Sequence, residues 1–250
     1  MVARYLLSIG LLALLVWPAM AREATDANLI TAIDVSGSIE ADEEHLELEG
    51  MAAAVVDPRF LEAIERGHHG RIGFVAFTWA NGEFIPLVPW TLIGSKAEAE
   101  QVAGLLRAAR SGPTMGYAMP IPSRTRPWRT GHATDVSAAI ERAIELSAAA
   151  PFDSWHNVIN ICANGIDNVG DGPAAARDRA NGKGLIVNGL IMGDRDDAAD
   201  VAAYFRDHVQ AGPGSFVIVA RAFRDITSAM LAKFLVELAA LPASAESRLR

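Results

Sequence analysis

The stretch LITAIDVSGSIEADEE, residues 29–44, indicates the kind of fold this chain adopts. It begins with an apolar run, passes through Asp34, Ser36 and Ser38, and ends in acidic residues typical of the first turn of a helix. A buried strand that leads directly into a helix is a unit of an α/β fold, and open α/β sheets bind ligands at the carboxyl ends of their strands. We therefore expect Asp34 to lie at the mouth of a ligand-binding crevice.

Apolar runs alternate with segments of helical periodicity along the rest of the sequence. Leu48, Met51, Ala52 and Val55 repeat at the spacing of one helix face, and residues 136–144 do the same. Such alternation predicts a mostly parallel sheet that is covered by helices on both faces. The expected strands are Leu29–Ile33, Arg71–Thr78, Phe84–Trp90, Val158–Cys162, Leu185–Met192 and Ser215–Val219, and further helices are expected at Lys96–Arg110, Pro173–Ala180, Ala198–His208 and Asp225–Leu238.

The run Phe84–Trp90 differs from the other expected strands. It follows its predecessor after the short connection WANGE, residues 79–83, which suits a hairpin. Pro86 and Pro89 suit an edge strand, because proline has no N–H to donate to a neighbour. The sequence therefore predicts a doubly wound, mostly parallel six-stranded sheet, Rossmann-like in general type, with one antiparallel edge strand.

The first 21 residues have the pattern of a secretory signal peptide. Arg4 supplies the positive charge, Leu6–Trp17 is apolar, and Ala19-Met20-Ala21 fits the rule for cleavage. The run is shorter than the ~20 apolar residues that span a bilayer, so we expect cleavage, no membrane span afterwards, and a periplasmic or secreted product. The expected organisation is a signal peptide at 1–21, one domain at 22–240 and a C-terminal tail at 241–250.

Charge and cysteine content restrict the class of partner and the chemistry. The formal net charge is -8, and loss of Arg4 with the signal makes it more negative, which argues against a nucleic-acid partner. Cys162 is the only cysteine, so no disulfide forms within the chain, and its place inside a strand favours a small buried hydrophobe over a nucleophile.

Three side-chain oxygens in the opening stretch have the spacing of a cation site. Asp34, Ser36 and Ser38 lie on one side of an extended or turning backbone, and Gly37 lets the chain bend between the two hydroxyls. They supply half of an octahedral shell for Mg²⁺, which binds oxygens at about 2.0–2.1 Å, and Ca²⁺ accepts the same ligands. A simpler role for either serine is to cap the following helix, which does not exclude the metal.

This arrangement of strand, DVSGS and helix resembles the start of a von Willebrand factor type A (VWA) domain. The metal-ion-dependent adhesion site (MIDAS) of that family combines D-x-S-x-S with a threonine from a later loop and an aspartate after the fourth strand. Thr134, in GHATDVSAAI, matches the threonine, and Asn164 in VINICANGIDN stands where the family usually has aspartate. The phrases HGRIGFVAF, VPWTLI and VNGLIM are similar to a bacterial exported branch that carries only a domain-of-unknown-function label.

The resemblance implies a strand order of 3-2-1-4-5-6, with Asp34 and Asn164 facing each other at the reversal point. It implies a Mg²⁺ site, with Mn²⁺ or Ca²⁺ as substitutes, whose ligands are Asp34, Ser36, Ser38, Thr134 and Asn164. The expected function is an exported adhesion-type module that captures an Asp or Glu side chain of a protein partner, and not an enzyme. Replacement of aspartate by Asn164 removes one charge, and Asp167 or Asp135 either restores it or is an ordinary loop or first-turn residue, the simpler role.

Other signals leave alternatives open. The long irregular segment 111–132 leads into Thr134, and its Arg124, Arg126, Trp128 and Arg129 form either a selectivity rim or a surface insertion. His68 and His69 precede a strand and are expected on the side opposite the site.

The competing functions are a VWA scaffold without metal and a nucleotide-binding Rossmann-like protein. The latter rests on GDGPAAA, residues 170–176, and on Asp194 after the next strand. Pro173, however, has no N–H to offer a phosphate. A hydrolase is disfavoured, because the sequence has no G-x-S-x-G elbow.

Overall fold

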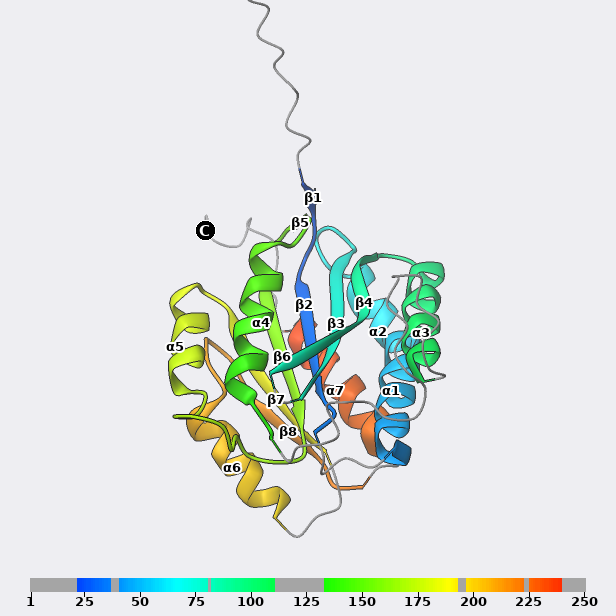
Figure 1. The fold of residues 1–250 in the computed structure, drawn as a ribbon. Helices are drawn as coiled ribbons and strands as arrows, with labels where there is room; N and C mark the ends of the chain where they lie inside the picture. Colours follow the sequence, from blue (N-terminus) through cyan, green and yellow to red (C-terminus); the bar gives the residue numbers. More distant parts are fainter. Residues whose placement is uncertain are drawn as a thin grey trace, which may run out of the picture.

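The sheet at the centre of the computed structural model has the predicted topology (Figure 1). The structure describes residues 22–36, 41–80, 82–110, 133–192, 197–222 and 225–239. All neighbouring strands of this sheet are parallel except β3 and β4, so the doubly wound sheet with one antiparallel edge strand is confirmed. In spatial order the strands are β4 (Glu83–Ile93), β3 (Ile72–Ala80), β2 (Asn28–Asp34), β6 (Asn157–Ala163), β7 (Ile186–Met192) and β8 (Val217–Ala220).

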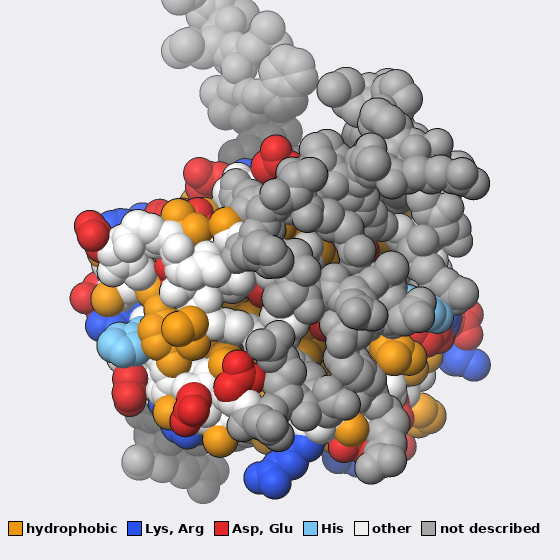
Figure 2. Space-filling view, turned by 60° about the horizontal axis from the view of Figure 1, so that its bottom comes forward, with side chains coloured by type: hydrophobic (Ala, Val, Ile, Leu, Met, Phe, Trp, Pro, Cys, Tyr) orange, Lys and Arg blue, Asp and Glu red, His pale blue; other side chains and the backbone are white. Residues whose placement is uncertain are grey.

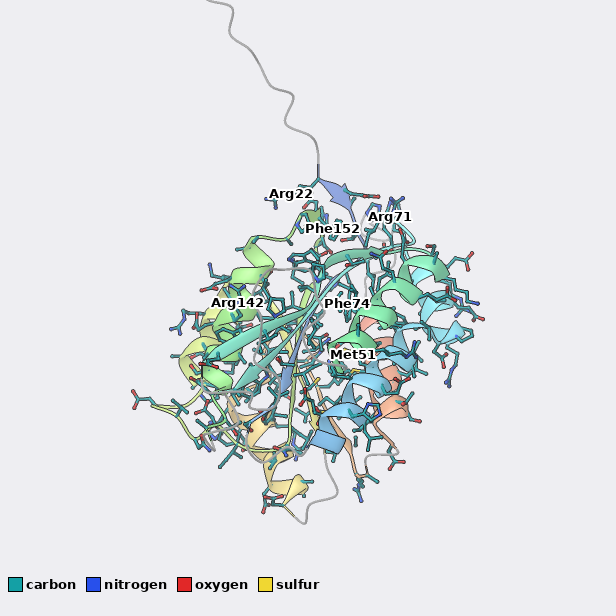
Figure 3. The ribbon with its side chains drawn as sticks, turned by 45° about the vertical axis from the view of Figure 1, so that its right-hand side comes forward. Arg22, Met51, Arg71, Phe74, Arg142 and Phe152 are labelled. Atoms are coloured by element: carbon teal, nitrogen blue, oxygen red, sulfur yellow. The ribbon has the colours of Figure 1, made fainter. Side chains whose placement is uncertain are left out.

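Helices cover both faces of the sheet, and each face has its own apolar core (Figure 1). Met51 and Phe74 belong to the core between the sheet and one helical layer, and both are labelled in Figure 3. That layer contains α1 (Ala41–Val55), α2 (Pro58–Glu65), α3 (Lys96–Arg110) and α7 (Ile226–Ala239). The opposite layer contains α4 (Val136–Ala148), α5 (Ala174–Gly182) and α6 (Ala198–His208). Within the described residues, no helix combines the length and hydropathy that a membrane crossing requires.

Helix α2 is not among the predicted elements, although its sequence carries a start signal. The Asp57 carboxylate accepts a hydrogen bond from the backbone N–H of Arg59, and Pro58 occupies the first turn. Phe60 and Ile64 are buried on one face. The helix spans little more than two turns, so its apolar face contains too few residues to form a periodic pattern.

A small second sheet lies at the amino end of β2. It pairs β1 (Glu23–Ala24) with β5 (Phe152–Asp153) in parallel, and the Arg71 guanidinium forms an ion pair with Glu23. Figure 3 shows Arg22, Arg71 and Phe152 gathered at this pole. The pole is the end of the molecule opposite to the carboxyl ends of the parallel strands, because β2 runs away from it.

Polar side chains cross the centre of the sheet in one row beneath α7. Thr31, Asn160 and Asn188 are register partners on β2, β6 and β7. The Lys233 ammonium donates to Asn160 Oδ1 and to the Glu237 carboxylate, and all three residues are buried. Asn188 Nδ2 donates to Glu237 Oε1 at 2.9 Å, and Asn160 Nδ2 donates to Glu237 Oε2 at 3.3 Å. These bonds satisfy groups that would be costly to bury alone, and they fix the position of α7 on the sheet.

Candidate metal centre

Asp34 ends β2 and is fully buried. Its Oδ1 accepts a hydrogen bond from the backbone N–H of Ser36 at 2.7 Å, which turns the chain out of the strand. Its Oδ2 is buried and, within the part of the chain that the structure describes, has no hydrogen-bond partner. Burial raises the pKa of the Asp34 carboxyl to about 7, although hydrogen bonds from Ser36 lower it. The strand end therefore presents a carboxylate oxygen that lacks the partner such a buried group normally has.

Two hydroxyls from distant parts of the chain meet beside this carboxylate. Ser36 Oγ lies 3.2 Å from Thr134 Oγ1, and both residues are buried. Ser36 belongs to the turn after β2, whereas Thr134 precedes the N-cap of α4. The structure thus brings together three of the predicted ligands: Asp34, Ser36 and Thr134.

Asn164 directly follows β6, the strand that pairs with β2. Ile33 and Cys162 are register partners, so Asn164 stands one level beyond Asp34 across a parallel pair whose strands are about 4.8 Å apart. Asn164 is buried, and a methyl group placed on Gly165 would lie 3.9 Å from Thr134 Oγ1. The loop after β6 therefore approaches the hydroxyl of Thr134.

The two aspartates considered as sources of a second charge bind backbone N–H groups instead. Asp135 is the N-cap of α4, and its Oδ1 accepts from the N–H of Ala138 at 2.8 Å. Asp167 Oδ2 accepts from the N–H of Ser137 at 3.0 Å, and its Oδ1 accepts from the N–H of Val169 at 3.0 Å. Asp34 is therefore the only carboxylate among the predicted ligands.

Asn168 ties the loop after β6 to Thr134. The backbone N–H of Thr134 donates to Asn168 Oδ1 at 2.8 Å, and the Asn168 N–H donates to the Thr134 carbonyl at 3.0 Å. The sequence patterns did not reveal this pairing, because the two residues are far apart in the chain and Asn168 does not belong to the MIDAS motif. Their reciprocal bonds hold the Thr134 hydroxyl beside the residues that follow β6.

Several residues singled out from the sequence lie outside the described part of the chain. These are Ser38, the segment 111–132 with Arg124, Arg126, Trp128 and Arg129, and Asp194. His68 and His69 precede β3, at the amino ends of the parallel strands and away from Asp34.

The glycines of residues 170–176 are explained by backbone conformation. Gly170 and Gly172 have φ of 61° and 82°, in the left-handed region that favours glycine. Helix α5 begins after Pro173, which gives no side-chain capping bond. These glycines serve a turn, which weakens the nucleotide-binding alternative.

Cys162 is buried on the same side of β6 as Asn160. Burial raises the pKa of its thiol to about 12; Lys233 lowers it, while Glu47 and Glu237 raise it. A thiol that is buried and protonated is a poor nucleophile, as expected for a packing residue.

The chemistry of this donor set suits a hard divalent cation. A carboxylate oxygen, two hydroxyls and an amide are the oxygen ligands that Mg²⁺ and Ca²⁺ accept, whereas soft metals prefer sulfur. Across the described ranges, no three His, Cys, Asp or Glu residues lie close enough to hold an ion together. Among the described residues, the predicted ligand oxygens at this end of the sheet are the Asp34 carboxylate, the Ser36 and Thr134 hydroxyls and the Asn164 amide.

The sheet order and the carboxyl-end position of Asp34 agree with the fold of VWA domains. The vWF domain of the type V pili tip protein Mfa5 from Porphyromonas gingivalis matches with a TM-score of 0.55 at 9% identity, covering 90% of this chain and 98% of that one. The pilus adhesin SpaC from Lactobacillus rhamnosus GG matches with a TM-score of 0.52 at 10% identity, covering 88% and 31%. The predicted VWA fold is confirmed.

A third match is proximal thread matrix protein 1 from the mussel byssus, in a structure with a zinc-occupied MIDAS motif. Its TM-score is 0.51 at 16% identity, covering 87% of this chain and 49% of that one. The chain therefore spans about half the length of this mussel protein. Likeness at such identities establishes the fold, and the chemistry of the site has to be argued from the residues of this chain.

The chain belongs to the family described as "Protein of unknown function (DUF1194)", which matches residues 24–120 and 117–242. The resemblance to a domain-of-unknown-function branch is thereby confirmed. A comparison with curated proteins gives no match.

Proposed function

We propose that this chain is a protein-binding module that uses a divalent cation to capture an Asp or Glu side chain of a partner protein. The observation that carries the proposal is Asp34 Oδ2, a buried carboxylate oxygen at the carboxyl end of β2 that has no hydrogen-bond partner among the described residues. Burial of an unpaired charge is costly, and a bound cation is one of the few ways to compensate for it. The Ser36 and Thr134 hydroxyls beside it supply further oxygens of the right kind.

The proposed ligands are Asp34, Ser36, Ser38, Thr134 and Asn164, holding Mg²⁺, or Mn²⁺ or Ca²⁺ in its place. Asp34 provides the charge, the hydroxyls and the amide provide neutral oxygens, and the Asn168 bonds hold Thr134 in position. A bound dication at this site would supply positive charge for a carboxylate from outside. With one carboxylate in the set, only part of that charge is neutralised by the chain.

The adhesion role gains support from what the matched structures are, at the level of analogy. One is a pilus adhesin, one a pilus tip protein, and one a matrix protein with zinc in its MIDAS motif. We extend to this chain the binding role, and not an enzymatic activity. We also propose export to the periplasm or beyond, with a signal peptide at 1–21, the VWA-like domain at 22–240 and a tail at 241–250.

The test compares Mg²⁺ binding by the wild type, Asp34→Asn and a control, Asp57→Asn. Asp57 caps α2 far from the site, so its variant also loses a carboxylate. We expect isothermal titration to detect Mg²⁺ binding to the wild type and to Asp57→Asn, and Mg²⁺ to raise the Tm of both. A cation at 100 times its Kd stabilises by about 2.7 kcal/mol. Asp34→Asn should show neither effect.

The same variants distinguish loss of the ligand from loss of the fold. In chelator, Asp34→Asn should be at least as stable as the wild type. The substitution removes a buried negative charge whose Oδ2 has no hydrogen-bond partner among the described residues. Equal Mg²⁺ responses in the wild type and Asp34→Asn would contradict the ligand assignment. Absence of any response in the wild type would instead favour the second candidate, a VWA scaffold without metal, for which Asn164 in the aspartate position is the supporting observation.

A further inference from the structure

Exposed apolar side chains lie beside the candidate metal centre. Ile166 and Val169, with 48% and 36% of their surface exposed, belong to the loop that follows Asn164. Figure 2 shows the face that carries the carboxyl ends of the strands, with a group of hydrophobic side chains open to solvent on the side of α5 and α6. A protein surface that gathers apolar side chains next to a polar site is typical of a protein-binding face.

Hydrogen bonds order the loop that presents these side chains and tie it to α4 and to Thr134. Asp167 receives the N–H groups of Ser137 and Val169, and Asn168 exchanges two bonds with Thr134. Ile166 and Val169 are therefore fixed relative to Thr134, a proposed ligand. A binding surface that is ordered in advance loses little conformational entropy when a partner docks.

Tyr204 of α6 is half-buried against the core of the same face and lies near the same loop, at the backbone of Asp167. A methyl group on Gly172 would lie 3.7 Å from the Tyr204 hydroxyl, and the Tyr204 ring contacts His208 with centroids 4.8 Å apart. Burial raises the pKa of Tyr204, and the Asp167 carboxylate raises it further, so the phenol stays neutral at physiological pH. Ile166, Val169 and Tyr204 are called the Ile166 patch below.

We propose that the Ile166 patch is the second contact of the partner-binding face, and that the partner is a protein loop with an acidic residue next to a bulky apolar residue. The inference rests on the proposed function, because the acidic residue is the one that the cation captures. Asp171 on the same loop is exposed and negatively charged, so it repels an acidic segment and leaves the cation to attract the carboxylate. The apolar residue provides contact area that a small cation lacks.

The experiment selects peptides on the metal-loaded protein. A phage library of disulfide-constrained random peptides is panned on the wild type in Mg²⁺ and eluted with chelator. We expect enrichment of sequences with Asp or Glu and, at a fixed spacing, a Leu, Ile, Phe or Trp. Two derivatives of the consensus peptide are then synthesised, one with the acidic residue changed to its amide and one with the apolar residue changed to serine.

Affinities of these peptides are measured for the wild type, the double variant Ile166→Ser/Val169→Ser, and the control Val236→Ser. Val236 is 47% exposed on α7, so the control loses an apolar side chain of similar exposure elsewhere. The double variant should bind the consensus peptide at least tenfold more weakly, bind the serine peptide as the wild type does, and keep the wild-type Mg²⁺ affinity and Tm. Val236→Ser should change none of these values.

The outcomes separate this inference from the proposed function. If eluted peptides carry the acidic residue without an apolar neighbour, or if the double variant binds the consensus peptide as the wild type does, the patch has no role and cation capture stands. If chelator releases no peptide and the wild type binds no Mg²⁺, the proposed function fails and the inference fails with it.

Discussion

Asn164 is the residue in which this chain departs from the usual MIDAS pattern. It is buried at the end of β6, one register level beyond Asp34, and it offers an amide oxygen where a carboxylate would add charge. Asp135 and Asp167 direct their oxygens to backbone N–H groups of α4 and of the loop after β6, as loop and first-turn residues do. In the proposed ligand set Asp34 is the one carboxylate, which makes position 164 the most informative one to change.

We expect Asn164→Asp to tighten Mg²⁺ binding by about tenfold or more, because a second carboxylate near a dication adds a strong attraction in a buried site. In chelator the variant should be less stable than the wild type, since two buried carboxylates then repel each other. Titration calorimetry and melting curves measure both effects. Asn181→Asp, at the exposed end of α5, is the control. Unchanged Mg²⁺ affinity in Asn164→Asp would remove residue 164 from the ligand set.

Part of the site could be predicted from single residues and part could not. Asp34, Ser36 and Thr134 were predicted as ligands because a short motif and a strand end identify them, and Ser36 and Thr134 do meet. No sequence pattern indicated that Asp167 and Asn168 tether their loop. Their hydrogen-bond partners are backbone groups at and near Thr134, about thirty positions earlier in the chain. Hydrogen bonds to backbone put no constraint on the identity of the residue that donates the N–H, so no motif records them.

At the scale of elements, α7 is held on the sheet by buried polar contacts as well as by apolar packing. Lys233 and Glu237, one turn apart, face Asn160 and Asn188 on two adjacent strands. Phe234, between them in sequence, packs on Phe60 and Phe74. A shift of α7 along its axis would break several hydrogen bonds at once, so the polar contacts specify one position of the helix.

We expect Glu237→Leu to lower the free energy of unfolding by about 3–5 kcal/mol, because it leaves the Lys233 ammonium buried without its ion-pair partner. The double variant Lys233→Met/Glu237→Leu should recover part of the loss, since it removes both charges. Urea unfolding of the wild type, Glu237→Leu, Lys233→Met and the double variant gives the coupling energy. Losses that simply add in the double variant would show that the pair is not coupled.

The elements that sequence patterns predicted well are those with many residues on a buried face. Helices α3 and α6 begin and end where their periodicity indicated, and the six strands of the central sheet are all present. The β1–β5 pairing was missed because each strand has two residues, too few for any alternation. The polar row was missed because Asn160 and Asn188 sit within apolar runs, where one polar side chain does not change the strand prediction.

At the scale of the whole molecule, the topology of the sheet could be predicted from the sequence, whereas the location of the partner-binding face could not. Alternation of strands and helices restricts the sheet to a few connections, and right-handed crossovers leave the observed order as a natural solution. The two cores follow, because a central parallel sheet must bury both faces. Which face binds a partner depends on exposed residues such as Ile166, and exposure of one apolar residue in a loop leaves no periodic signal.

The β1–β5 sheet and the carboxyl ends of the parallel strands lie at opposite poles of the domain. We therefore expect attachment to a surface through the β1–β5 pole to leave the proposed binding face accessible. Cys162 is buried with a raised thiol pKa, so a cysteine introduced at exposed Trp155, near β5, should be the one that reacts with maleimide. We expect Trp155→Cys, coupled to a surface, to capture the consensus peptide in Mg²⁺ as the free protein does. Val169→Cys coupled in the same way should lose capture. Equal capture by both surfaces, measured by plasmon resonance, would contradict the assigned binding face.

Strand β1 enters the domain at the pole opposite to the carboxyl ends of β2 and β6 (Figure 1). Cleavage of the proposed signal peptide would leave the new N-terminus at Arg22, next to β1. If this terminus were fastened to a support, such as an envelope or a larger assembly, the carboxyl ends of β2 and β6 would face away from the support into the surrounding medium. A molecule that approached from the medium would then meet the face with the candidate metal centre first, and the domain would not have to reorient.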